Sequence, residues 1–235
     1  FELSGNFVVA DTRDWGLEVD ANISWNRNRL FNLPADQYAS QLWYGASQVF
    51  IQRNDMPIGA IYGYVEDGFY DNIAEVRADP MYRTVSDAEA QRMVGEIKYV
   101  DVDGDGQLTA DRDRVVIGDT NPDYTYGFNV SGRWKKLSLS MFFQGTQGND
   151  VYNGNLMMIG MSSIGNITQD AYNTRWTPEN ASIAKWPRVT TAMTRNMLLS
   201  NRYVEDGSYF RLKTVSLEYD FGRIARTVGL RAYFT

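Results

Sequence analysis

The residues best suited to chemistry form one acidic run, which reads Asp-Val-Asp-Gly-Asp-Gly-Gln-Leu-Thr and begins at Asp101. Aspartates at alternate positions can converge on one cation, and a glycine after the third of them permits a sharp turn. The next residue, Gln107, would supply its backbone carbonyl. Three carboxylates this close repel one another unless a cation lies between them. The run predicts a structural calcium site with Asp101, Asp103, Asp105 and Gln107 as ligands.

The loop differs from the usual calcium-binding loop at the last ligand position. Arg112 stands at the position that normally carries an acid, and an aspartate lies on each side of it. One extra residue would bring Asp113 into the closing role, so we predict Asp113 as a further ligand. The alternative is a solvated acidic turn, because Asp-Gly pairs favour turns without any metal.

The chain lacks the side chains that several other chemistries need. It has 235 residues with no His and no Cys, which excludes a Ser-His-Asp triad, a Cys nucleophile, a zinc finger and disulfides. Paired carboxylates can hydrolyse glycosides, but a flexible glycine-rich loop is poor at raising a carboxyl pKa by burial. The net charge of −6 argues against a nucleic-acid partner. We therefore expect a binding or transport role and no catalytic residues.

Aromatic side chains between the predicted strands offer flat apolar faces on which sugar rings could stack. The candidates for ligand binding are Trp43, Tyr44, Tyr152, Trp176 and Trp186. Together with the calcium loop they leave a second interpretation open, a soluble calcium-dependent β-sandwich module that binds glycans.

The elements that must position these residues are β-strands. From Trp15 to Trp25 every odd residue is apolar and every even residue is polar or glycine, and the same alternation recurs from Tyr124 to Ser131. Successive side chains of a strand point to opposite faces, so each such strand has one apolar and one polar face. Eight strands are predicted, near residues 1–10, 15–27, 47–53, 57–65, 123–134, 136–145, 208–221 and 228–235.

The connections between these strands alternate between short and long. The long ones are 28–46, 66–122 and 146–207, and the second should hold one short helix from Asp87 to Val94, capped by Ser86 and Glu89. Outer-membrane barrels have short turns at one rim, long loops at the other and aromatic girdles at both. Aromatic residues near the strand ends fit the girdles: Trp15, Trp25, Tyr124, Trp134, Tyr209 and Phe221.

A barrel and a sandwich predict opposite environments for the apolar faces of the strands. In a membrane barrel these side chains face outward to lipid, whereas a soluble sandwich buries them in its core. The residues that separate the two interpretations are Leu17, Val19, Phe128, Val130, Leu139 and Val215.

Five runs of sequence occur in order along the chain: Gly59–Tyr64, Ile97–Gly106, Arg175–Asn180, Trp186–Arg188 and Tyr203–Lys213. Together they resemble the SusC/RagA-type TonB-dependent outer-membrane transporters, and Tyr203–Lys213 is the most specific of them. The departures are Asp103, where an asparagine is expected, and the extra residue before Asp113.

The resemblance implies that residues 1–235 are a partial C-terminal barrel, an antiparallel transmembrane segment of about eight strands from a plugged barrel of roughly 22. It also implies import of glycans or peptides across the outer membrane of a Gram-negative bacterium. The implied partners are a SusD-like surface lipoprotein, the TonB complex, reached through a part of the receptor absent here, and outer-membrane lipid.

Overall fold

The computed structural model describes residues 1–39, 48–161, 165–192, 194–225 and 228–235. The chain divides into two compact units. Unit 1 consists of Phe1–Asn28, Asn121–Asn149 and Asp206–Thr235, and unit 2 consists of Arg29–Thr120 and Asp150–Glu205.

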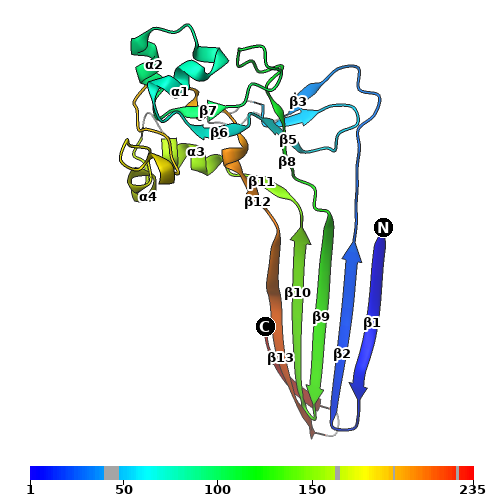
Figure 1. Cartoon of the computed structure of the whole chain (residues 1–235). Helices are drawn as coiled ribbons and strands as arrows, with labels where there is room; N and C mark the ends of the chain where they lie inside the picture. Colours follow the sequence, from blue (N-terminus) through cyan, green and yellow to red (C-terminus); the bar gives the residue numbers. More distant parts are fainter. Residues whose placement is uncertain (40–47, 162–164, 193, 226–227) are drawn as a thin grey trace. The chain divides into compact units, whose positions relative to one another are not determined.

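Unit 1 is one six-stranded antiparallel sheet whose strands are neighbours in chain order (Figure 1). Strands β2 and β9 pair over ten residues, although nearly the whole first insertion of unit 2 separates them in sequence. The sheet is therefore a simple meander that two insertions interrupt. Its strands are β1 (Glu2–Asp11), β2 (Trp15–Ser24), β9 (Tyr124–Trp134), β10 (Leu137–Gln147), β13 (Tyr209–Ala225) and β14 (Val228–Phe234).

The short connections of the sheet lie at one end and the insertions leave from the other. At the first end, Trp15 pairs with Trp134, where β9 turns into β10 through Lys135 in a left-handed conformation (φ 54°). At the opposite end, Thr125 pairs with both Ser24 and Thr146. Both insertions of unit 2 leave the sheet beyond these paired residues. The short turns and the insertions are therefore attached to opposite ends of the strands.

The register of the sheet keeps apolar residues beside apolar residues. Val19 pairs with Val130, Val130 with Met141, and Met141 with Val215. The register of β13 shifts between the partners of Phe142 and Phe143, where Lys213 is an extra residue. Because a one-residue shift moves every following side chain to the other face, this bulge places Phe210 and Leu212 on the apolar face.

The apolar face of unit 1 is not covered by the described part of the chain. Every buried hydrophobic residue among the described residues belongs to unit 2, whereas Val215 is 41% exposed and Leu139 is 37% exposed. Leu17, Val19, Phe128 and Val130 are only partly buried, by their neighbours within the sheet. The sandwich interpretation, which requires a core on this face, is therefore wrong.

Unit 2 is built from three small sheets and short helices. Its sheets are β3-β4-β5-β8 (Gln37–Ala39, Phe50–Gln52, Ala60–Gly63, Val115–Asp119), β6-β7 (Glu66–Phe69, Ile97–Tyr99) and β11-β12 (Asp150–Tyr152, Val204–Asp206). Its α-helices are α1 (Ile73–Ala78), α2 (Asp87–Met93), α3 (Gly154–Met161) and α4 (Gln169–Asn173). Four 3-10 helices complete it: η1 (Pro80–Tyr82), η2 (Ala181–Ile183), η3 (Arg195–Met197) and η4 (Asn201–Tyr203). None of the helices in the described ranges is long and apolar enough to cross a membrane.

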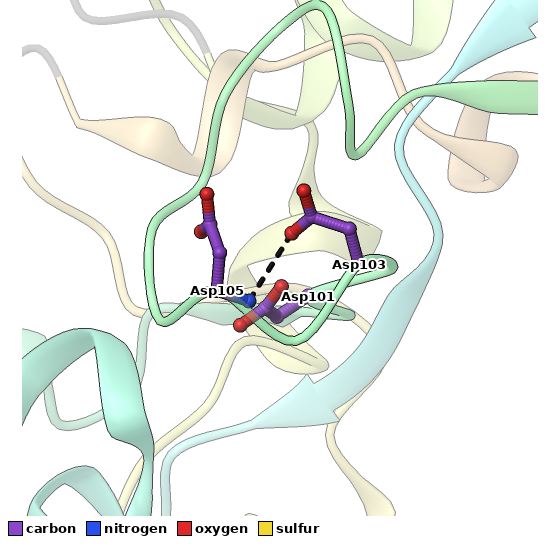
Figure 2. Close-up of side chains that lie close together, drawn as sticks. All are labelled: Asp101, Asp103 and Asp105. Carbon is purple, nitrogen blue, oxygen red and sulfur yellow. Dashed lines mark hydrogen bonds between the residues drawn. The ribbon is translucent and has the colours of Figure 1, made fainter.

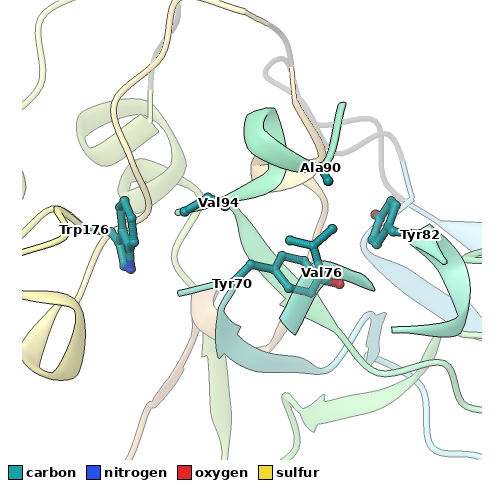
Figure 3. Close-up of a cluster of buried hydrophobic side chains, with 6 residues drawn as sticks. All are labelled: Tyr70, Val76, Tyr82, Ala90, Val94 and Trp176. Atoms are coloured by element: carbon teal, nitrogen blue, oxygen red, sulfur yellow. The ribbon is translucent and has the colours of Figure 1, made fainter. Parts of the chain in front are cut away.

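The cores of unit 2 join segments that are far apart in sequence. One cluster packs Tyr70, Val76, Tyr82, Ala90 and Val94 with Trp176, which comes from the second insertion; Figure 3 shows Trp176 at one side of it and Tyr82 at the other. A second cluster packs Val49, Ile61, Met157, Leu199 and Tyr203. The insertions are therefore folded around their own hydrophobic cores.

The structure corrects two sequence expectations. The segments 47–53 and 57–65 are not part of the large sheet; they contain the short strands β4 and β5, in which Ile51 and Ile61 are fully buried. Unit 1 thus has six strands where eight were expected. The regions 66–122 and 146–207, expected as loops with one helix, hold several helices, although the capping box of Ser86 and Glu89 at α2 is as expected.

Candidate functional site

The aspartate-rich loop connects β7 to β8 in unit 2. One carboxylate oxygen from each of Asp101, Asp103 and Asp105 lies within 4.8 Å of the others, and Figure 2 shows the three side chains together. Among the described residues, this is the acidic group arranged to hold a metal ion. The expected convergence of these three side chains is therefore present.

Backbone N–H groups of the loop hold these carboxylates in place. Asp101 accepts hydrogen bonds from Gly104 and Gly106, both at 2.8 Å, and Asp103 accepts one from Asp105 at 3.1 Å. The bond from the Gly106 N–H lowers the pKa of Asp101, so its carboxylate stays charged. Gly104 and Gly106 have φ angles of 74° and 80°, a region that glycine occupies without strain.

An arginine of the same loop supplies positive charge to two of the aspartates. The Nη1 atom of Arg112 lies 3.1 Å from Asp105 Oδ2 and 3.4 Å from Asp103 Oδ2. The arginine side chain is 63% exposed, so water screens this attraction. The residue that breaks the calcium pattern in sequence thus contacts the same carboxylates that would bind a cation.

Asp113 occupies a different position from the other aspartates. It is fully buried, and its two carboxylate oxygens accept hydrogen bonds from the N–H groups of Val102 at 2.9 Å and Thr109 at 2.5 Å. Its carboxylate closes the loop by joining the loop's two ends. Sequence spacing predicted that Asp113 closes the loop as a metal ligand, and the structure places its oxygens on backbone donors.

Of the five aromatic candidates for ligand binding, the three that the structure describes are at least partly buried. Trp176 is only 6% exposed, and its indole N–H donates to Asp71 Oδ1 at 2.9 Å. Tyr152 packs against the cluster around Tyr203 with its hydroxyl buried. Trp186 is partly buried, and the guanidinium of Arg202 lies 5.7 Å from its ring.

Trp176 therefore belongs to the core of unit 2, and its covered ring cannot stack on a sugar, whereas Tyr152 is only partly buried beside its cluster. Trp43 and Tyr44 lie outside the described residues.

Sequence reasoning missed a pocket of about 670 Å³ in unit 2. Its walls include Arg92, Glu96, Arg188 and Arg195. No short motif signals this pocket, because Glu96 and Arg188 meet across 92 positions of sequence.

The fold as a whole is shared with solved structures. The chain matches the RagAB peptide transporter over 99% of its length, with a TM-score of 0.70 and 21% identity, and covers 24% of that chain. A structure of the RagAB peptide importer in an open-open state matches equally well, with a TM-score of 0.70 and 20% identity. At this identity the likeness shows a shared fold, including the long sheet and its insertions.

Curated relatives then give the family. The chain is 33% identical over 227 residues to TonB-dependent receptor P3 of Formosa agariphila, and 42% identical over 225 residues to TonB-dependent receptor P26 of the same organism. Each match covers 94% of this chain and 21% of the relative. The chain is homologous to a segment of the TonB-dependent receptors, and it spans about a fifth of the length of the curated relatives it matches.

This finding confirms the predicted family. Receptors of this family lie in the outer membrane of Gram-negative bacteria and are not enzymes, as the sequence predicted. No protein-family profile matches the chain.

Proposed function

We propose that this chain forms part of the wall of a SusC/RagA-type TonB-dependent transporter, with unit 2 as its folded extracellular insertions. The observation that carries this proposal is the six-stranded sheet whose apolar face is covered by nothing in the described chain. Exposing such a face to water would be unfavourable, by about 25 cal/mol for each Å² of apolar surface. Lipid removes that cost, and a closed barrel removes the cost of the free strand edges.

The aromatic residues of the sheet support a membrane-spanning orientation. Trp15 and Trp134 pair at the turn end, and Phe1 and Trp25 lie together at the opposite end with ring centroids 5.5 Å apart. Ten residues separate Tyr124 from Trp134 on β9, which is about 34 Å along a strand and roughly 26 Å along the membrane normal at the usual tilt. This length matches an apolar band of about 25 Å.

The opposite face of the sheet suits the interior of a wide barrel. Asn6 donates to Glu18 at 2.5 Å and to Asp20 at 2.7 Å, so polar side chains of neighbouring strands bond to one another. Ser140 donates to Asn129 at 2.9 Å on the same face. A water-filled or plugged lumen hydrates such groups, whereas lipid would not.

The cargo and partners of the complete receptor are proposed by likeness. RagAB is described as a peptide importer, and a two-component name fits a barrel with a second subunit. We propose a glycan or peptide as cargo, a SusD-like surface lipoprotein as partner, and the proton-motive force, transmitted by the TonB complex, as the source of energy.

Calcium in the aspartate-rich loop is a separate proposal. It is supported by the convergence of Asp101, Asp103 and Asp105 and by the left-handed conformation of Gly104 and Gly106. Gln107 would add its backbone carbonyl, and Asp113 would hold the loop closed around the ion. No chemical step follows from such an ion, whose role would be to stabilise the loop.

Uptake by living cells tests the transport proposal. Cells that carry the complete receptor should accumulate a fluorescein-labelled mixture of tryptic peptides or of plant-glycan oligosaccharides. Deleting the receptor or collapsing the proton-motive force should abolish accumulation of at least one of the two mixtures. Unchanged accumulation of both mixtures in the deletion strain would contradict the proposal.

A further inference from the structure

The pocket of about 670 Å³ in unit 2 has the features of a small-molecule site. It lies between the end of α2 and the segment that leads into η3. Its volume falls within the range of ligand pockets, about 300–1,000 Å³. Met93, Ala192 and Leu198 supply apolar walls, and arginines supply charge.

One charge pair of the pocket forms within the protein, but two of its buried atoms have no hydrogen-bond partner. Glu96 is 2% exposed, and its Oε1 atom accepts a hydrogen bond from Arg188 Nη2 at 2.7 Å. The same nitrogen donates to the backbone carbonyl of Arg92 at 2.7 Å. Glu96 Oε2 and Arg188 Nε remain buried without a hydrogen-bond partner.

The remaining arginines of the pocket, Arg92 and Arg195, make no close ion pair within the described ranges, although the charge of Arg92 also acts on the carboxylate of Glu89 in α2. With Arg188 they place three positive charges in the pocket walls, against the one negative charge of Glu96 in the same walls. This excess contrasts with the net charge of −6 of the whole chain.

Arg195 is held ready to receive an anion. Its Nη1 atom donates to the Tyr82 hydroxyl at 2.6 Å, and its guanidinium carbon lies 5.4 Å from the centroid of the Tyr82 ring. Tyr82 is itself fixed by an edge-on contact with Tyr70, with ring centroids 5.7 Å apart. The Arg195 residue is nevertheless exposed, so its other N–H groups are accessible from the pocket.

We propose that this pocket binds an organic carboxylate carried on an apolar body. The planar fork of a guanidinium matches a carboxylate in two parallel hydrogen bonds. The apolar walls favour an aliphatic or aromatic group beside that carboxylate, whereas a fully hydrated anion such as phosphate would leave them uncovered. The site requires only unit 2, so it does not depend on which cargo the receptor imports.

Calorimetry on the full-length receptor in lipid nanodiscs tests this site. The probes are N-acetyl-phenylalanine and its C-terminal amide, which differ only in the charge of the carboxyl group. We expect saturable binding of the acid, with the amide roughly 10- to 100-fold weaker because charged hydrogen bonds are lost. Equal binding of the two probes, or no heat from the acid at millimolar concentration, would overturn the proposal.

Two variants locate the binding. Arg195→Gln should weaken the acid at least tenfold, and Ala192→Phe should block it by filling the pocket, while the far-UV circular dichroism of both stays that of the wild type. Arg29→Gln, an exposed arginine outside the pocket, is the matched control and should bind as the wild type does. Acid binding that survives both pocket variants would place it elsewhere and reject this site.

A third probe separates two sources of the same chemistry. The tripeptide Ala-Ala-Phe with a free C-terminus presents the carboxylate as a peptide end. Tighter binding of the tripeptide than of N-acetyl-phenylalanine would assign the site to peptide ends, and equal binding of the two would assign it to organic acids in general. Either result supports a carboxylate site, provided that Arg195→Gln removes the binding.

Discussion

Individual residues of the aspartate-rich loop divide into two kinds. Asp101, Asp103 and Asp105 bond to nearby N–H groups of their own loop, and the structure leaves them only partly buried or exposed. Asp113 is fully buried and joins the ends of the loop. The carboxylates of the first three aspartates are accessible to ions, whereas the carboxylate of Asp113 stabilises the loop backbone.

Replacing Asp113 by alanine should destabilise this loop. Two N–H groups, those of Val102 and Thr109, would lose their charged acceptor, at a cost of roughly 2 kcal/mol. Hydrogen exchange of peptides covering 100–114 in the full-length receptor should report this loss. The neighbouring Asp111→Ala, at an exposed position, is the control and should exchange as the wild type does; equal exchange in both variants would contradict the role of Asp113.

Arg112 should compete with calcium. Its Nη1 atom lies within 3.4 Å of two of the aspartates, so Arg112→Glu removes a competing cation and adds an acid at the closing position. We expect calcium affinity to rise at least fivefold, or about 1 kcal/mol, from the Coulomb term alone even in water. Calorimetry of the full-length receptor with calcium chloride measures this, and Arg29→Glu controls for the change in net charge. A lower or unchanged calcium affinity would contradict a cation site between these aspartates.

The loop should tolerate mild acid. The lowered pKa of Asp101, caused first by the Gly106 N–H bond, means that the folded loop holds this carboxylate charged more strongly than the unfolded chain does. The resulting stabilisation is present above the usual pKa of 3.8 and is lost as pH falls through the lower folded value. Exchange of the Gly104 and Gly106 amides, corrected for intrinsic rates, should stay slow at pH 5. Loss of protection already at pH 5 would contradict this assignment.

Residue-level predictions from the sequence succeeded where the chemistry is local. The spacing of three aspartates in five residues is enough to bring their carboxylates together, because the turn between them is set by the glycines. Trp176 was misassigned because its burial depends on Tyr70 and Val76, which lie about a hundred residues earlier. No local pattern distinguishes a core tryptophan from an exposed one.

Single glycines control how the elements of unit 2 pack. Gly95 follows α2 with a φ of +83°, and a Cβ atom there would lie 2.5 Å from the Trp176 ring. Its N–H and carbonyl also bond to Tyr70 and Arg188. This one residue therefore links the first insertion to the second within unit 2.

Gly95→Ala should destabilise unit 2 by roughly 2–5 kcal/mol, the sum of left-handed backbone strain and overpacking. Gly68→Ala is a matched control, because its φ is +81° but a Cβ atom there meets nothing within 4 Å. Gly68→Ala should lower the free energy of unfolding only by the strain of the left-handed backbone, about 1–2 kcal/mol. Local hydrogen exchange of residues 66–99 in the full-length receptor compares the two, and equal losses would show that the contact with Trp176 is unimportant.

At the element scale, the sequence predicted the long strands better than the short ones. The alternation over ten residues in β2 and β9 follows from one continuous apolar face, and it was therefore enough to predict these strands. In β4 and β5 only three or four residues pair, and Ala60 to Gly63 are buried throughout. Strands as short as these carry too few residues for an alternation that would distinguish them from strands of a barrel wall.

The whole molecule combines two ways of covering apolar surface. Unit 2 buries its apolar side chains in clusters of its own, whereas the face of unit 1 around Phe128, Phe143 and Phe210 stacks its rings within the sheet and remains open on the outside. The proposed place of this sheet in a barrel wall would put lipid against that face. The apolar face of the sheet should therefore point toward lipid in the complete receptor.

Spin labels along β9 test that claim most directly. The chain contains no cysteine, so single cysteines at residues 125 to 133 can be labelled in a full-length receptor without other cysteines, reconstituted in bilayers. We predict that labels at Tyr126, Phe128 and Val130 collide with oxygen but not with a water-soluble nickel complex. Labels at Asn129 and Ser131 should show the reverse, which gives an accessibility period of two. Low accessibility of the Phe128 and Val130 labels to both reagents would mean that protein covers this face, and would contradict the account.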